Sequence, residues 1–238
     1  MPQTHRTASR PGLPPVPVAV LLPRTSHRQP APTPVRAPGT WSRSTWCGID
    51  AWNVAALICA YSRPDDVVLT VGPEAMLADV AAYLGRHPAT LLTEDGDRRW
   101  IRASGRTRRL VGQLGAGTVL AQLPDRHVDP ADLSVTTQAV RGWRSLLRSG
   151  GHLLVALTAA STADGRLSPR SNVIAAARTA GLLWQQEFLV PLAPLPEYEP
   201  RAMPDTAATT PAALVDGRHQ VAHLKLFAFR NAPGGSDA

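Results

Sequence analysis

The clearest pattern in the sequence is an alternation of apolar runs and an amphipathic stretch across residues 66–95. Val67–Val71 is a short β-branched apolar run, which is typical of a buried parallel strand. After a glycine-proline pair, apolar residues recur at helical spacing over Met76–Leu84. A second glycine follows, and Ala89–Thr93 is again apolar. The pattern predicts a strand, a helix and a second strand, which form the βαβ unit of a doubly wound sheet.

The rest of the chain continues the alternation of strands and helices. Predicted helices carry apolar residues at helical spacing between polar or glycine ends: Ile49–Ala60, Asp132–Arg148, and a helix capped by Ser171 that runs to Ala180. Predicted strands are apolar runs bounded by turn residues: Gly117–Leu123, His152–Leu157, Leu182–Val190 and His219–Arg230. Leu110–Leu114 fits a short strand or a turn. The sequence therefore predicts an α/β fold with a mostly parallel, Rossmann-like sheet and helices on both faces.

Residues 1–45 differ in composition from the rest of the chain. They hold ten prolines, and residues 1–46 hold six arginines and no acidic residue. The formal charge of +7 therefore belongs to this segment, because the remainder has 19 basic and 18 acidic residues. We expect a disordered tail over residues 1–45 and another over 233–238, with one domain between them at 46–232. The alternative is a basic arm that follows phosphates or a partner surface.

Several classes of protein lack their signatures in this chain. No apolar run approaches the roughly 20 residues of a membrane-spanning helix. Cys47 and Cys59 lack metal-ligand spacing, and the histidines are scattered, so we expect no metal site and two free thiols in a cytoplasmic protein. G-x-G-x-x-G, G-x-x-x-x-G-K-[ST] and G-x-S-x-G do not occur, so nicotinamide, nucleotide-hydrolysing and α/β-hydrolase functions are not indicated.

A dense group of arginines surrounds one tryptophan within residues 96–109. Its main interpretation is a solvated loop or an edge hairpin. The alternative is a nucleic-acid contact in which the arginines bind phosphates and the indole stacks on a base. The candidate residues for that contact are Arg98, Arg99, Trp100, Arg102, Arg106, Arg108 and Arg109.

Four segments, in this order, resemble one enzyme superfamily. They are YSRPDDVVL at 61–69, WRSLLRSGGHLLVAL at 143–157, NVIAAARTAGL at 172–182 and AHLKLFAFR at 222–230. Together the chain resembles class I S-adenosylmethionine-dependent methyltransferases, in particular actinobacterial DNA N4/N6-type methylase-like proteins. The resemblance covers about residues 46–232. It implies S-adenosylmethionine as the cofactor and a last strand that runs antiparallel to its neighbours.

The cofactor loop departs from the pattern of the superfamily, which is D-P-F/M-x-G-x-G-T-T. Thr70 stands at the acidic position, Gly72 remains nearby, and Glu74 replaces a glycine. A glutamate there puts a negative charge where backbone N–H groups should face the carboxylate of the cofactor. Glu94 and Asp95 stand where an acidic residue would hold the ribose hydroxyls, although a solvated turn explains them equally well.

The catalytic loop also departs from the pattern, which is D/N/S-P-P-Y/F. Gln122 takes the polar position, Pro124 is retained, and Asp125 replaces the aromatic residue on which a flipped base would stack. Only about 25 residues separate the second strand from this loop, which leaves little room for the usual third strand and helix.

The packing elements therefore match the superfamily better than its two functional loops do. This asymmetry predicts a pseudoenzyme or binding module whose partner is a nucleic acid or a protein, with cofactor binding in question. The alternative is an active S-adenosylmethionine-dependent methyltransferase acting on DNA or RNA bases.

Overall fold

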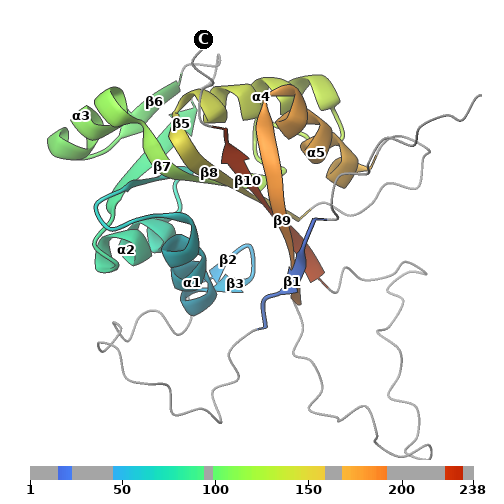
Figure 1. Ribbon diagram of the computed structural model, residues 1–238, viewed down its shortest axis with the longest axis horizontal. Coiled ribbons are helices and arrows are strands. Elements are labelled where there is room, and N and C mark those ends of the chain that lie inside the picture. The colour runs from blue at the N-terminus through green and yellow to red at the C-terminus, as the bar shows by residue number, and fades with distance from the viewer. Residues whose placement is uncertain (1–15, 23–44, 94–98, 159–167, 192–222, 233–238) are drawn as a thin grey trace, which may run out of the picture.

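The central element of the fold is an eight-stranded sheet in the order β1-β9-β10-β8-β7-β4-β5-β6 (Figure 1). The computed structural model describes residues 16–22, 45–93, 99–158, 168–191 and 223–232. The strands of the sheet are β1 (Val18–Val20), β4 (Val67–Val71), β5 (His87–Thr93), β6 (Arg99–Arg102), β7 (Ala116–Leu123), β8 (Leu147–Leu157), β9 (Leu182–Pro191) and β10 (His223–Asn231). A separate hairpin pairs β2 (Thr45–Trp46) with β3 (Ile49–Asp50).

Strand direction confirms the predicted fold class. β5, β4, β7 and β8 form a parallel set, and β1 is parallel to β9. The last strand, β10, lies between β8 and β9 and is antiparallel to both. This arrangement is the mostly parallel sheet with an antiparallel last strand that the resemblance implied.

Helices cover both faces of the sheet. The helices are α1 (Ala51–Tyr61), α2 (Ala75–Tyr83), α3 (Gly105–Leu114), α4 (Leu133–Ser145) and α5 (Pro169–Thr179). α1 and α2 lie on one face, and α3, α4 and α5 lie on the other (Figure 1). Alternate residues of each central strand enter separate cores, so that Leu69 packs with α4 and α5 while Val68 packs with α1 and α2.

Several boundaries differ from the sequence prediction, and two of the differences have a clear cause. The helix expected over Asp132–Arg148 ends at Ser145, because Leu147 already pairs with Ala116 as the start of β8. The cap of α5 is Ser168 and not Ser171, since the Ser168 hydroxyl accepts the N–H of Ser171 at 3.2 Å. In both cases the boundary is set by hydrogen bonds of the folded chain, which the apolar spacing of the sequence does not show.

α3 is a helix that the sequence analysis missed. Leu110–Leu114, predicted as a short strand or turn, forms its second half, and part of the expected arginine-rich loop forms its first half. The Ser104 hydroxyl accepts the N–H of Thr107 at 3.1 Å and starts the helix. Thr107 and Val111 are buried one turn apart, and this narrow apolar face between arginines is why the signal was weak.

One edge of the sheet is formed by an antiparallel strand. β6 follows β5 as an antiparallel edge strand, with Thr93 opposite Arg99. Where a solvated loop or an edge hairpin was expected over residues 96–109, the chain forms the edge strand β6 and then begins α3, which leads directly to β7. The short connection noted in the sequence therefore contains one antiparallel strand and one helix.

Part of the predicted N-terminal tail is ordered in the sheet. Residues 16–22, within the segment 1–45 expected to be disordered, include β1, which pairs with β9 at Val18 and Glu187. A proline-bounded apolar run can serve as an edge strand, because an edge requires hydrogen bonds on only one side. Residues 1–15, 23–44 and 233–238 lie outside the described part of the chain.

Gly112→Ala and Gly115→Ala form a matched pair that tests α3. A Cβ at Gly112 meets no atom within 4 Å, and we expect a gain of about 0.5–1 kcal/mol in the free energy of unfolding, because alanine is the better helix former. Gly115 has a φ of +76°, and its Cβ would lie 2.7 Å from the backbone nitrogen of Arg148. We therefore expect Gly115→Ala to cost more than about 1 kcal/mol. Urea denaturation measures both, and a destabilising Gly112→Ala would contradict the helix.

Candidate active site

The candidate site lies at the carboxyl ends of the central strands. α2 follows β4 on one face of the sheet and α4 follows β7 on the other, so the chain diverges between these two neighbouring strands. Such a switch point is where ligands bind in open α/β sheets. A cavity of about 200 Å³ opens there on the α4 face, lined among others by Val71, Thr93, Arg99, Asp125, Gln138 and Trp143.

The loop between β4 and α2 contains one glycine in the left-handed backbone conformation. Gly72 has a φ of +88°, and no atom lies within 4 Å of the position of a Cβ. The space beside its backbone is therefore open. Two residues later, Glu74 immediately precedes α2 and makes no side-chain capping bond to the helix. The glutamate thus stands at the positive end of the α2 dipole with its carboxylate uncommitted to the cap.

Thr70 serves as a structural tie. Its side chain is fully buried, and its hydroxyl lies 3.3 Å from both the Ala89 carbonyl and the Thr90 hydroxyl of β5. It links the ends of β4 and β5. The predicted acidic position therefore holds a hydroxyl that the sheet itself satisfies.

Cys47 belongs to this region, although its spacing gave no sign of it. It occupies the turn of the β2–β3 hairpin with a φ of 55°. Burial, and next the negative charge of Glu74, raise the pKa of the Cys47 thiol to about 12. The hairpin thus approaches the beginning of α2, and only the tertiary structure brings the thiol and the carboxylate together.

The predicted catalytic residues do not converge on one pocket. Gln122 shares the strand face of Leu120, which packs with α1 and α2, whereas Asp125 lines the cavity on the α4 face. One Asp125 carboxylate oxygen accepts the N–H groups of His127 and Val128 at 2.6 and 2.7 Å. Pro124, which precedes Asp125 in the chain, is exposed. The Asp125 side chain therefore stabilises its own turn.

The arginine-rich segment is divided between the two faces. Arg99 lines the cavity, and its guanidinium lies against Gly142 of α4, where a Cβ would overlap it. Trp100 and Arg102 point to the opposite side of β6, with the Arg102 guanidinium 5.4 Å from the indole centroid. The α3 arginines Arg106, Arg108 and Arg109 are exposed. Glu94, Asp95 and Arg98 lie outside the described residues.

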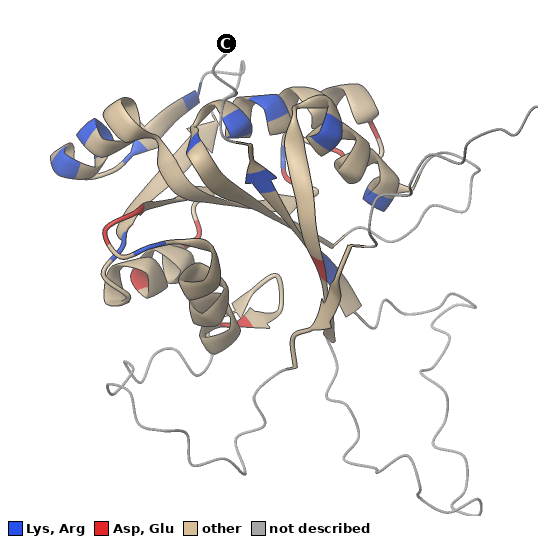
Figure 2. Cartoon of the chain, in the orientation of Figure 1, with Lys and Arg blue, Asp and Glu red and all other residues tan. Residues whose placement is uncertain are grey.

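Basic side chains are concentrated on one face of the molecule. α3, α4 and α5 together contain seven arginines and no acidic residue, whereas α1 and α2 contain no arginine or lysine. Figure 2 shows these arginines along the three helices. Of the seven, Arg170 is paired with the buried Glu187, with its Nε 3.0 Å from one carboxylate oxygen. The other six give this face a positive field.

Two kinds of feature are absent from the described part of the chain. No group of three or more histidine, cysteine or acidic side chains there could hold a metal ion. Within the same ranges, no helix is long and apolar enough to cross a membrane.

Comparisons with known proteins find likeness at the level of the fold. No family model matches the chain, and no curated protein matches its sequence. The N-methyltransferase NodS from Bradyrhizobium japonicum aligns with a TM-score of 0.44 and 15% identity over 76% of this chain and 94% of that one. TrmN from Thermus thermophilus gives 0.44 and 14% over 77% and 49%, and an S-adenosylmethionine-dependent methyltransferase from Methanosarcina mazei gives 0.45 and 8% over 74% and 97%. The fold class itself rests on the strand order and directions described above.

The raised pKa of the Cys47 thiol predicts that Cys47 and Cys59 differ in reactivity. Thiol reagents attack the thiolate, which at pH 8 makes up only about 10⁻⁴ of a thiol with a pKa of about 12. We expect Cys47 to react far more slowly than the exposed Cys59 with a chromogenic disulfide reagent. In a Cys59→Ser background, Glu74→Gln should accelerate the reaction of Cys47, because it removes a charge that raises the pKa. Asp79→Asn, on the exposed side of α2, is the control. Equal reaction rates of Cys47 in the two variants would contradict an effect of the Glu74 charge on the thiol.

Proposed function

We propose that this protein is a methyltransferase-fold binding module in which methyl transfer has been lost. The observation that carries the proposal is the position of Glu74 at the start of α2. In the superfamily that the chain resembles, the carboxylate of S-adenosylmethionine faces backbone N–H groups of this loop. Here a glutamate carboxylate stands at the same helix end, and two negative charges in one place repel each other.

The size of the cavity supports the same proposal. Pockets for small ligands and cofactors commonly measure about 300–1,000 Å³, and the cavity at the switch point measures about 200 Å³. Arg99 and Trp143 line it from opposite elements, β6 and α4. The antiparallel pair β5–β6 therefore places a long side chain where the superfamily needs space.

The catalytic loop supports the loss of activity independently. A base-methylating enzyme needs a polar group for the target amine and an aromatic platform for the flipped base. Asp125 supplies no aromatic surface and is engaged by two backbone N–H groups of its own loop. Gln122 points to the other face of the sheet, so the two residues do not form one acceptor site.

The proposed partner is a nucleic acid. Six arginines on α3, α4 and α5 have no ion-pair partner among the described residues, and these helices carry no acidic residue, which makes a face suited to a phosphate backbone. The resemblance to actinobacterial DNA N4/N6-type methylase-like proteins supports the same class of partner, with a protein as the less favoured one. Two free cysteines agree with a cytoplasmic location.

The alternative function, an active methyltransferase on DNA or RNA bases, is favoured by one observation. Gly72 keeps a left-handed conformation with open space beside it, as a loop that approaches a cofactor closely requires. In that case Thr70, Gly72 and Glu74 would line the methionine end, and Glu94 or Asp95 would hold the ribose.

Calorimetric titration of S-adenosylmethionine and S-adenosylhomocysteine into the full chain separates the two functions. The full chain is needed because β1 belongs to the sheet. We expect no binding at millimolar ligand. Any residual affinity should rise roughly fivefold in Glu74→Gln, since one repulsive charge is removed, and stay unchanged in Asp79→Asn. Micromolar binding by the unmodified protein would overturn the proposal and favour the active enzyme.

The nucleic-acid contact has its own test in fluorescence anisotropy with labelled single-stranded DNA and RNA. We expect Arg106→Gln/Arg109→Gln to weaken binding by about tenfold and to reduce its salt dependence, because two phosphate contacts are lost. Arg126→Gln/Lys225→Gln, outside α3, α4 and α5, removes the same charge and is the control. An equal loss in both double variants would show that α3 is not the contact.

A further inference from the structure

A second and larger cavity lies at the amino ends of the parallel strands. It measures about 610 Å³ and forms where α1 ends, β8 begins and β10 ends. Three arginines line it from three separate segments: Arg63 before β4, Arg148 in β8 and Arg230 in β10. This edge of the sheet is opposite to the one that holds the candidate active site, so the two cavities are separate features.

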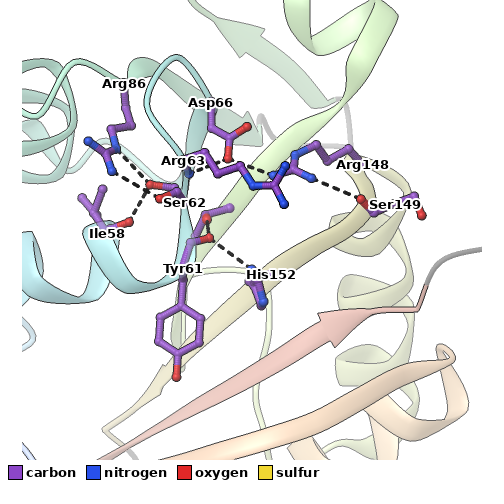
Figure 3. Close-up of polar contacts among 10 residues, drawn as sticks. Ile58, Tyr61, Ser62, Arg63, Asp66, Arg86, Arg148, Ser149 and His152 are labelled. Atoms are coloured by element: carbon purple, nitrogen blue, oxygen red, sulfur yellow. Dashed lines mark hydrogen bonds and ion pairs between the residues drawn. The ribbon is translucent and has the colours of Figure 1, made fainter.

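The positive charge of this cavity exceeds its negative charge. Asp66 is the carboxylate that neutralises part of it, with Oδ2 3.0 Å from the Arg148 Nη2. The same oxygen also accepts the backbone N–H of Arg63 at 2.7 Å. Within the described residues, no carboxylate pairs with the guanidinium groups of Arg63 or Arg230. Figure 3 shows the Arg63 side chain extending toward Arg148, so two like charges approach each other.

The walls of the cavity are held by an extended hydrogen-bond framework. The Tyr61 carbonyl accepts the Thr118 hydroxyl at 2.5 Å and lies 3.1 Å from Nδ1 of His152 (Figure 3). Arg86 donates from Nε to the Ser62 hydroxyl at 3.1 Å and from Nη2 to the Ser62 carbonyl at 3.2 Å. These bonds fix the end of α1 against β8, so the arginines start from an ordered scaffold.

Two side chains of the cavity wall, Arg148 and His152, bear on the binding of an anion. Arg148 Nε is buried and has no hydrogen-bond partner among the described residues. An unused donor of this kind is costly unless something accepts it. Burial lowers the pKa of His152, and the charges of Arg230 and Arg148 act in the same direction, whereas the hydrogen bond to the Tyr61 carbonyl and the charge of Asp66 oppose the shift.

We propose that this cavity binds a phosphate group. Guanidinium groups bind phosphate oxygens through paired N–H donors, and Arg63, Arg148 and Arg230 approach the cavity from three sides with one carboxylate between them. Ser149 adds an exposed hydroxyl at the rim. The volume of about 610 Å³ accommodates a phosphate with an attached organic group. The ligand is thus a phosphomonoester or a phosphodiester of a nucleic-acid backbone.

Titration of inorganic phosphate into the full chain, followed by calorimetry and by ³¹P NMR at low salt, tests the site. We expect Arg63→Gln/Arg230→Gln to weaken phosphate binding by at least about tenfold. Both side chains are exposed, so this double variant should fold, and equal melting temperatures will check it. Arg126→Gln/Lys225→Gln, with basic residues at the carboxyl edge of the sheet, loses the same charge and should retain full binding.

The outcomes distinguish the proposal and the source of the phosphate. Absence of phosphate binding, or an equal loss in both double variants, overturns the site. If phosphate binds as expected, a short oligonucleotide without terminal phosphates is added. Displacement of the bound phosphate identifies a nucleic-acid backbone as the ligand, and failure to displace it identifies a small phosphomonoester.

Discussion

Burial of the central strands on both faces is the constraint on which the structure depends. In β7, every residue of Ala116–Leu123 except Gln122 is buried, and Val67–Thr70 of β4 are equally covered. Strands covered on both sides leave no room for polar chemistry except at their ends. The helices must then lie on both faces, and polar chemistry on the central strands is confined to the two edges where these strands begin and end. Glu187 of β9, outside the central strands, meets Arg170 of α5 on the face of the sheet.

The two edges of the sheet differ in how their polar groups are paired. At the carboxyl edge the polar groups satisfy one another: Thr70 bonds to β5, and Asp125 bonds to its own turn. At the amino edge a cavity about three times as large holds arginines with a single neutralising carboxylate. Because uncompensated charge near a scaffold of fixed hydrogen bonds favours an oppositely charged ligand, the amino edge has the stronger character of a binding site.

The antiparallel pair β5–β6 connects the cavity at the carboxyl edge with the basic face. By returning antiparallel to β5, β6 places Arg99 over the end of the sheet, where Gly142 of α4 makes room for its guanidinium. The same pair of strands leads into α3 and so adds three exposed arginines to the face already formed by α4 and α5. One local feature therefore both narrows the cavity at the carboxyl edge and extends the basic face.

The sequence by itself determined the elements whose pattern is local and repetitive. The βαβ unit, α1, β7 and β9 follow from apolar periodicity, because burial on a fixed side imposes a fixed spacing. α3, β1 and the Ser168 cap were decided by tertiary structure, since an arginine-rich helix and an edge strand are stabilised by what they pack against. The candidate site divides in the same way, since Thr70, Gly72 and Glu74 could be placed on one loop from sequence. The face of Gln122, the effect of the Glu74 charge on the Cys47 thiol and the meeting of Arg63, Arg148 and Arg230 could not. Their side chains come from segments far apart in the chain, and only the register of the folded sheet sets the distances between them.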